Sequence, residues 1–346
     1  MTFLDEVAQS YRTDMADPSD SNDGNTNVGD TDSTAGTTGA TTARADYLTV
    51  DIGLHGLRAR RTGTDPEMRL DIRDLTGSPS ARDLLDAVGA LTAHRPPALT
   101  VWSLGGVGAA VDAATLASAS PQAGRTVVVD AATATLVGAL GAVEPGVVLE
   151  MTSGVQTIVT DFDTRWHRID GWGPILGDRG SGAWLGGQGL AAALRFCDGV
   201  PGGSAPLLQA GRRAFGDERT WRTMLETLPV ADVLADFAPV VGDVARRDPV
   251  AEGLCRLAGE HLADAICAGA ALLPSAPMTA TGGLLLIDAV KVSFASALGK
   301  RYKVLLPALG DTLEGVRTIA EHLLDGGHLS HRPPHIYMQG RNVLTA

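Results

Sequence analysis

Two apolar runs in the chain end in the same way, with an acidic residue followed by a polar turn that contains glycine. The first covers residues 47–53 (YLTVDIG) and the second covers residues 146–154 (GVVLEMTSG). Each is followed by a segment suited to a returning strand, 57–60 after the first and 156–160 after the second. The repetition predicts two strand–turn–strand hairpins and an internal duplication of the fold.

Apolar residues recur at helical spacing in several other segments. This spacing predicts helices over 80–93, 131–141, 183–197, 205–215, 218–228, 230–246, 249–270 and 311–324. Further buried strands are predicted at 98–103 and 127–129, and residues 279–287 combine a strand with a Thr-Gly-Gly turn. Alternating strands and helices are typical of an α/β fold, here in two units with a cleft between them.

The composition narrows the function classes. The 346 residues suffice for two domains of ordinary size. A net charge of −12 argues against a nucleic-acid partner, because proteins that bind nucleic acid present a basic face. Residues 13–46 are rich in Asp, Asn, Ser, Thr and Gly, and we expect them to be disordered because they offer little apolar surface to bury.

The cysteines and histidines suggest no metal or disulfide framework. The three cysteines are widely spaced, at Cys197, Cys255 and Cys267. With no signal peptide visible, we expect a reduced, cytoplasmic setting. No carboxylate or cysteine accompanies the histidines His328, His331 and His335, so no metal site is expected there. The uncharged run 266–287 is long enough to span a membrane, but prolines and a Gly-Gly pair interrupt it, and no span is expected.

The densest group of chemically useful residues lies in the segment 171–182 (GWGPILGDRGSG), directly before an apolar run. Its glycines permit sharp turns and a close approach of the backbone to a ligand. A helix that starts there would offer free N–H groups to that ligand. By itself this pattern fits a ligand-binding loop and a tight structural turn equally well.

Four other places could take part in phosphoryl transfer, which needs phosphate cradles, a partner for Mg²⁺ and a base near the acceptor hydroxyl. Asp51 ends the first predicted strand, and Asp130 follows three valines at the start of a predicted helix. A carboxylate at such a strand end can act as a general base, and Asp130 can also cap the helix. Polar, glycine-containing turns stand at 152–154 and 281–283.

The segment 171–182 closely resembles the GWGxxLGDEGSG loop of N-acetylglucosamine kinases and their relatives. These proteins form the BadF/BadG/BcrA/BcrD-type ATPase family, within the actin/hexokinase/Hsp70 superfamily. The likeness extends from Tyr47 to about Leu324. It implies an α/β fold with two actin-like (ribonuclease H-like) subdomains around a nucleotide cleft, and a homodimer is common in the family.

The resemblance also divides the chain. It implies an N-terminal subdomain over 47–142, to which the last helix at 311–324 returns, and a C-terminal subdomain over 143–310. A disordered acidic tail at 1–46 precedes them, and a C-terminal extension at 325–346 follows them.

By resemblance, the candidate residues take particular roles. Asp130 matches the family's NDAxxA motif, whose Asp takes the proton of the sugar hydroxyl. Asp51 and Gly53 match the motif DxGGTxT. The match implies that Asp51 contacts Mg²⁺, directly or through water, and that the hairpin with Gly53 lies around the phosphates. Ser153 and Gly154 match the second phosphate hairpin, GTGS.

The remaining roles concern adenosine and sugar. The expected ATP contacts beyond the phosphates are Thr281, Gly282 and Gly283. The expected sugar contacts are Thr152, Trp172 and Asp178. Together these matches predict phosphorylation of an amino sugar of the N-acetylglucosamine or glucosamine type, with ATP and Mg²⁺ as cofactors.

The chain departs from the family at several motif positions. These are Leu54, His55, Leu57, Val129, Val155 and Arg179, which replace glycine, threonine, asparagine, serine or glutamate. The departures lie mostly at the phosphate hairpins, so the alternative function is that of a catalytically impaired homologue. Such a protein would bind sugar or nucleotide as a sensor or interaction protein.

Overall fold

The computed structural model describes residues 46–53, 56–63, 67–71, 79–92, 96–106, 111–120 and 124–340. The expected disorder of the N-terminal tail and the positions Leu54 and His55 therefore lie outside the described residues. Two sheets organise the described chain, with strand orders β10-β5-β4-β1-β2-β3 and β8-β7-β6-β9.

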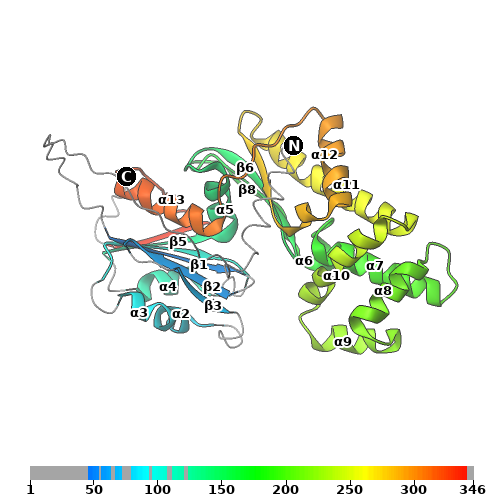
Figure 1. Ribbon diagram of the computed structural model, residues 1–346. Coiled ribbons are helices and arrows are strands. Elements are labelled where there is room, and N and C mark those ends of the chain that lie inside the picture. Colours follow the sequence, from blue (N-terminus) through cyan, green and yellow to red (C-terminus); the bar gives the residue numbers. More distant parts are fainter. Residues whose placement is uncertain are drawn as a thin grey trace, which may run out of the picture.

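The first sheet contains β1 (Tyr47–Gly53), β2 (Gly56–Arg61), β3 (Met68–Asp71), β4 (Leu99–Leu104), β5 (Arg125–Asp130) and β10 (Ile336–Gly340). Its central strands are buried on both faces, as the adjacent residues Val101 and Trp102 of β4 illustrate, since they belong to different core clusters. One face is covered by α13 (Thr312–Leu324) and α5 (Ala131–Leu140). The other is covered by α2 (Ala81–Ala87) and α4 (Ala113–Ala119), with α3 (Gly89–Thr92) beside them (Figure 1).

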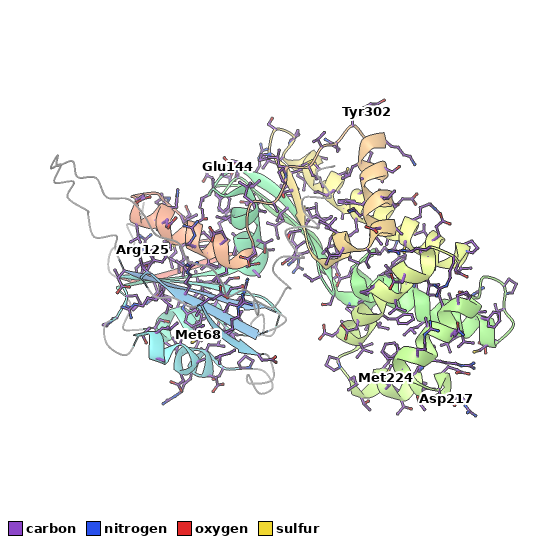
Figure 2. The ribbon with its side chains drawn as sticks, viewed as in Figure 1. Met68, Arg125, Glu144, Asp217, Met224 and Tyr302 are labelled. Carbon is purple, nitrogen blue, oxygen red and sulfur yellow. The ribbon has the colours of Figure 1, made fainter. Side chains whose placement is uncertain are left out.

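The second sheet contains β6 (Gly146–Met151), β7 (Val155–Thr160), β8 (Trp166–Asp170) and β9 (Met278–Thr281). A thick helical layer packs on one of its faces (Figure 1). The helices of this part are α6 (Gly173–Leu176), α7 (Gly182–Cys197), α8 (Ala205–Phe215), α9 (Trp221–Thr227), α10 (Val230–Ala245), α11 (Pro249–Leu272) and α12 (Asp288–Lys300), with the 3₁₀ turns η3 (Glu218–Thr220) and η4 (Gly283–Leu286). Figure 2 shows the two lobes, with Met68 and Arg125 on the first and Met224 and Tyr302 on the second.

Helix α5 is shared by the two sheets, because its opposite sides belong to different cores. Val137 packs with the first sheet and α13, whereas Leu136 packs against β6 and β7 of the second sheet. Residues 132–140 are all buried. Helix α13 crosses α5 in backbone contact, since a Cβ atom on Gly138 would lie 2.0 Å from the carbonyl oxygen of Asp311. A Cβ on Gly315 would likewise lie 1.8 Å from the carbonyl oxygen of Ala134.

Most predicted elements are confirmed with small shifts of their ends. The predicted helix at 80–93 is interrupted at Val88, giving α2 and α3. Six of the described elements were not predicted from the sequence: β3, α4, β8, α6, α12 and β10. The uncharged run 266–287 divides into the end of α11, a loop, β9 and a 3₁₀ turn. Among the described residues, no helix combines the length and the apolar character that crossing a membrane requires.

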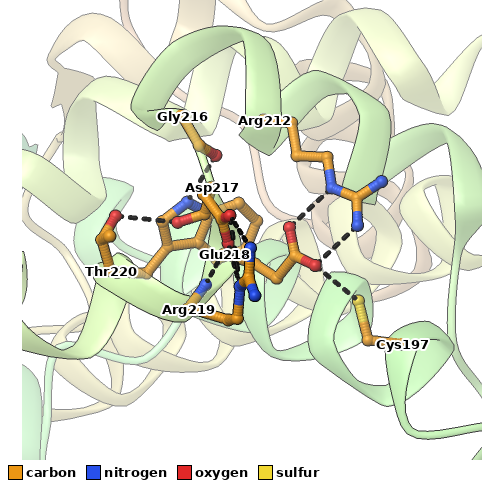
Figure 3. A network of polar contacts seen from close by, with 8 residues as sticks. Cys197, Arg212, Gly216, Asp217, Glu218, Arg219 and Thr220 are labelled. Atoms are coloured by element: carbon orange, nitrogen blue, oxygen red, sulfur yellow. Dashed lines mark hydrogen bonds and ion pairs between the residues drawn. The ribbon is translucent and has the colours of Figure 1, made fainter.

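A polar network joins α7, α8 and the 3₁₀ turn η3 at the outer end of the helical layer (Figure 3). Arg212 donates two hydrogen bonds of 2.6 Å to Glu218, and Asp217 accepts hydrogen bonds from Arg219. The Arg212 contact lowers the pKa of Glu218 to about 2. Cys197 lies beside this network, with its Sγ atom 3.8 Å from Glu218 Oε1.

The cysteines of this lobe differ in accessibility, which gives a labelling prediction. Cys197 is exposed, whereas Cys255 is buried, and its burial raises the pKa of the Cys255 thiol to about 11. Because the thiolate is the reactive form, we expect iodoacetamide at pH 8 to label Cys197 in the native protein and to leave Cys255 unmodified. Peptide mass spectrometry measures both sites, and labelling in denaturant is the control. Equal labelling of the two cysteines in the native protein would contradict this packing.

Candidate functional site

The acids Asp51 and Asp130 lie at the same edge of the first sheet. Strand β4 runs parallel to both β1 and β5, with Ser103 opposite Asp51 and Leu104 opposite Asp130. Adjacent strands are about 4.8 Å apart, so two spacings separate the backbones of these acids by about 10 Å. This edge holds the carboxyl ends of parallel strands, where α/β folds place their ligands.

Asp51 is buried and paired with an arginine. Its carboxylate accepts a hydrogen bond of 2.7 Å from Arg58, which also binds Asp311 at 2.5 Å. Burial raises the pKa of Asp51, although the charge and the hydrogen bond of Arg58 act in the opposite direction. The guanidinium of Arg58 is therefore shared between two carboxylates, one at the end of β1 and one at the start of α13.

Glu150 of the second sheet interacts electrostatically with both Asp51 and Asp130. It stands near the end of β6, as Asp51 does in β1, and accepts hydrogen bonds from Gln156 (2.9 Å) and Thr135 (3.4 Å). Burial raises the pKa of Glu150, and the negative charges of Asp130 and Asp51 raise it further. In the sequence, Glu150 is the acid of the second predicted hairpin, and no role was predicted for it.

The raised pKa of Glu150 predicts that its charge destabilises the ligand-free protein at neutral pH. Between the pKa values of the unfolded and folded states, the folded protein binds the additional proton, so stability falls as the pH rises through this window. We expect Glu150→Gln to raise the melting temperature at pH 7 by about 2–4 °C, the change that about 1 kcal/mol produces in a domain of a few hundred residues. Scanning calorimetry should show this difference disappearing below about pH 4, where the glutamates of both states are protonated. The exposed Glu144→Gln is the control, and a lower melting temperature for Glu150→Gln at pH 7 would contradict the prediction.

Asp130 caps α5, as predicted, and it receives further donors. Its carboxylate accepts hydrogen bonds from the backbone N–H of Thr133 (2.8 Å), the hydroxyl of Thr133 (2.9 Å) and Nδ1 of His335 (2.8 Å). Its side chain is 29% exposed, so a ligand can still reach it. The contact between His335 and Asp130 was not predicted, because no pattern in the sequence relates residues 205 positions apart.

The second polar turn and the start of α7 are bonded to each other. The N–H of Thr152 donates to the carbonyl of Gly154 at 2.9 Å, which closes the turn. The N–H groups of Gly182 and Ala183 donate to the carbonyls of Thr152 and Ser153, at 3.2 and 3.0 Å. The expectation of free N–H groups at this helix start is therefore wrong for these two groups, because the turn at 152–154 accepts their hydrogen bonds.

Asp178 lies in the interior of the loop at 171–182, against the same turn. It is buried, its N–H donates to Asp170 at 2.6 Å, and its Oδ1 accepts from the N–H of Gly173 at 3.2 Å. A Cβ atom on Gly154 would lie only 2.7 Å from Asp178 Oδ2, so the carboxylate and the turn are in direct contact. Burial raises the pKa of Asp178.

Trp172 is 66% exposed and is therefore not a core residue. The guanidinium of Arg168 lies 5.1 Å from the centre of its ring, within the range of a cation–π contact. Arg179, which stands where the family has glutamate, is also exposed. The loop thus exposes the ring of Trp172 and the guanidinium of Arg179, and Arg168 of β8 lies over the tryptophan ring.

The turn at Thr281, Gly282 and Gly283 leaves the second sheet beside β6. Thr281 pairs with Glu150, so this turn and the turn at 152–154 lie at the same edge. Gly282 has a φ of +129°, and a Cβ atom there would lie 1.8 Å from the carbonyl oxygen of Met151. Only glycine fits this position.

A separate groove of about 930 Å³ runs between α11 and α12, lined by charged residues that include Glu252, Arg256, Asp288 and Lys300. None of the carboxylates described above lines it. The predicted site residues instead lie at one edge of each sheet: Asp51, Gly53 and Asp130 on the first sheet, and 152–154, Asp178 and 281–283 around the second.

Neither the family models nor the curated protein sequences include a match to this chain. Among solved structures, the chain is similar to a proposed N-acetylglucosamine kinase from Chromobacterium violaceum, with 25% identity and a TM-score of 0.63 over 81% of this chain and 99% of that one. A proposed N-acetylglucosamine kinase from Porphyromonas gingivalis is 17% identical, with a TM-score of 0.61 over 80% and 98% of the two chains. The two sheets and their helices therefore form the α/β fold of the actin-like sugar kinases.

Proposed function

We propose that this protein transfers the γ-phosphoryl group of ATP to a hydroxyl of an amino sugar, of the N-acetylglucosamine or glucosamine type. The observation that carries the proposal is the electrostatic interaction of Glu150, near the end of β6, with Asp51 and Asp130 at one edge of the first sheet, in a protein with the fold of sugar kinases. The matching loop at 171–182 supports the amino-sugar class. We also propose membership of the BadF/BadG/BcrA/BcrD-type family on the same motifs.

The glycine-containing turns hold the nucleotide. Gly53, Ser153 and Gly154 lie around the phosphates, where a small residue allows close approach of the backbone. The turn at Thr281, Gly282 and Gly283 receives the adenosine. The sugar contacts are Thr152, Trp172 and Asp178.

The acidic residues fit a hard divalent cation such as Mg²⁺. Burial raises the pKa values of Asp51 and Glu150, and a bound cation would offset the cost of keeping their carboxylates ionised. No group of three or more ligating side chains lies together among the described residues. Mg²⁺ is usually bound by one or two carboxylates together with phosphates and water, so a group of three protein ligands is not required. Asp51 would hold the ion, directly or through water, and the bound ion neutralises charge on the transferring phosphoryl group.

Asp130 acts as the general base. A carboxylate has about four acceptor positions, of which the described donors take three. The remaining position accepts the proton of the acceptor hydroxyl as that oxygen attacks the γ-phosphorus, while the bond from this phosphorus to the β,γ-bridging oxygen breaks and ADP leaves. The capping contacts keep the carboxylate at the end of β5 while this occurs.

We propose that the protein has two subdomains with a nucleotide cleft between them. The first comprises residues 47–142 and 311–324, and the second comprises residues 143–310. The position of α13 against the first sheet supports the return of the last helix. A cytoplasmic homodimer that uses no nucleic-acid or membrane partner is part of the same proposal.

A second candidate is an impaired homologue that binds sugar or nucleotide without turnover. The ion pair between Arg58 and Asp51 favours it, because the arginine occupies the acid that would hold Mg²⁺. The replacement of hairpin residues by Leu57 and Val155 points in the same direction.

A coupled assay with Mg-ATP and a panel of hexoses and hexosamines tests the proposal. We expect turnover with an amino sugar, and a thermal shift with both sugar and nucleotide. Stabilisation by a sugar without turnover would favour the impaired homologue. No turnover and no shift with any nucleotide would contradict the kinase.

A further inference from the structure

His335 contacts the proposed base through both its main chain and its side chain. Its carbonyl accepts the N–H of Asp130 at 3.0 Å, and its Nδ1 atom lies 2.8 Å from Asp130 Oδ2. An ionised carboxylate only accepts hydrogen bonds, so Nδ1 must carry the proton in this contact. The imidazole therefore donates to the oxygen that it fixes.

The ring of His335 is itself held by the second sheet. It stacks on Trp166 of β8, with the ring centres 4.7 Å apart and the planes at 15°. Phe162 packs edge-on against the same tryptophan at 5.5 Å. The imidazole therefore stands between a carboxylate of the first sheet and an aromatic pair of the second.

The segment that carries His335 is anchored independently of this contact. Strand β10, which starts at Ile336, pairs with β5 from Val129 to Arg125. The ring of His331 accepts the N–H of Met338 at 3.0 Å, which closes the turn before β10. Substitution of the His335 side chain should thus leave the backbone of this segment in place.

We propose that His335 is a positioning residue for phosphoryl transfer, which orients the Asp130 carboxylate toward the acceptor hydroxyl. This inference rests on the proposed kinase function. The Nδ1–H of His335 binds one carboxylate oxygen together with the Thr133 hydroxyl, and the backbone N–H of Thr133 binds the other. With both oxygens fixed, the unused acceptor position points in one direction, and no proton passes to the histidine.

The experiment compares His335→Ala, His335→Asn and His328→Ala with the wild-type protein. We expect His335→Ala to lower kcat by about ten- to hundredfold, the effect of one lost hydrogen bond to a charged group, with little change in the KM for sugar. His335→Asn should regain most of the lost kcat, because its amide can donate from a position close to that of Nδ1. His328→Ala removes an exposed histidine from the connection between α13 and β10 without touching Asp130, and it should keep kcat near the wild-type value.

The outcomes separate this inference from the proposed function. A wild-type protein without turnover on any sugar contradicts the kinase itself. An active wild type with unchanged kcat in His335→Ala overturns only the role of His335, as does an equal loss in all three variants. Independently of turnover, nitrogen-15 NMR should show His335 with its proton on Nδ1 in the wild type and a changed signal in Asp130→Ala. The proton on Nε2 alone in the wild type would overturn the proposal.

Discussion

Asp130→Asn is expected to lower kcat by about 10²–10⁴-fold, the contribution that a positioned general base makes. Asparagine caps helices as well as aspartate does. The variant should therefore keep the hydrogen bond to the N–H of Thr133 and the cap of α5. It should lose the ability to accept the proton, together with the oxygen that accepts from His335. A coupled assay gives kcat, and thermal unfolding gives the stability.

Asp112→Asn is the matched control, because Asp112 caps α4 through similar contacts with Ala114 and Thr115. Its kcat should equal that of the wild type. If Asp130→Asn retained full kcat, Asp130 would be a helix cap alone, and the proposed mechanism would be wrong. A large loss of stability in Asp130→Asn would instead indicate a structural role for the charge.

Gly138→Ala is expected to destabilise the protein by about 1–3 kcal/mol or more, the usual cost of overpacking a core. The new methyl group would stand 2.0 Å from the carbonyl oxygen of Asp311, and both groups belong to backbones that the helix crossing holds in place. Because α5 packs against both sheets, the crossing can open only if one of the two cores loosens. Chemical denaturation measures the free energy of unfolding.

Gly253→Ala provides the contrast. A Cβ atom on Gly253 would meet nothing within 4 Å, and the residue lies inside α11. Alanine is favoured over glycine in a helix by about 0.5–1 kcal/mol, so this variant should be more stable than the wild type. Equal effects of the two substitutions would contradict the close crossing of α5 and α13.

The parts of the site that depend only on residues close together in the sequence were predicted correctly. Asp51 and Asp130 were predicted at strand ends because each follows an apolar run, and both occupy those positions. The capping role of Asp130 was predicted from the same local pattern, and its contact with Thr133 confirms it. The glycine-rich loop was placed correctly before α7.

Some missed elements had a usable pattern. Helix α12 buries Val290, Phe294, Ala297 and Leu298, which are spaced three to four residues apart or adjacent. Strand β10 had weaker evidence, because its five residues gain their partner only when β5 is already in the sheet. Short edge strands of this kind have little local pattern of their own.

By itself, the sequence determined most strands and helices, the duplicated hairpins and the acids near their ends, since each depends on residues within about ten positions. Only the tertiary structure decided which groups act on those acids: Arg58 binds both Asp51 and Asp311, Glu150 lies within electrostatic range of Asp51 and Asp130, and His335 binds Asp130. Hydrogen bonds and charges act over a few ångströms in space. Residues far apart in the chain come within that range only when the two sheets pack around α5.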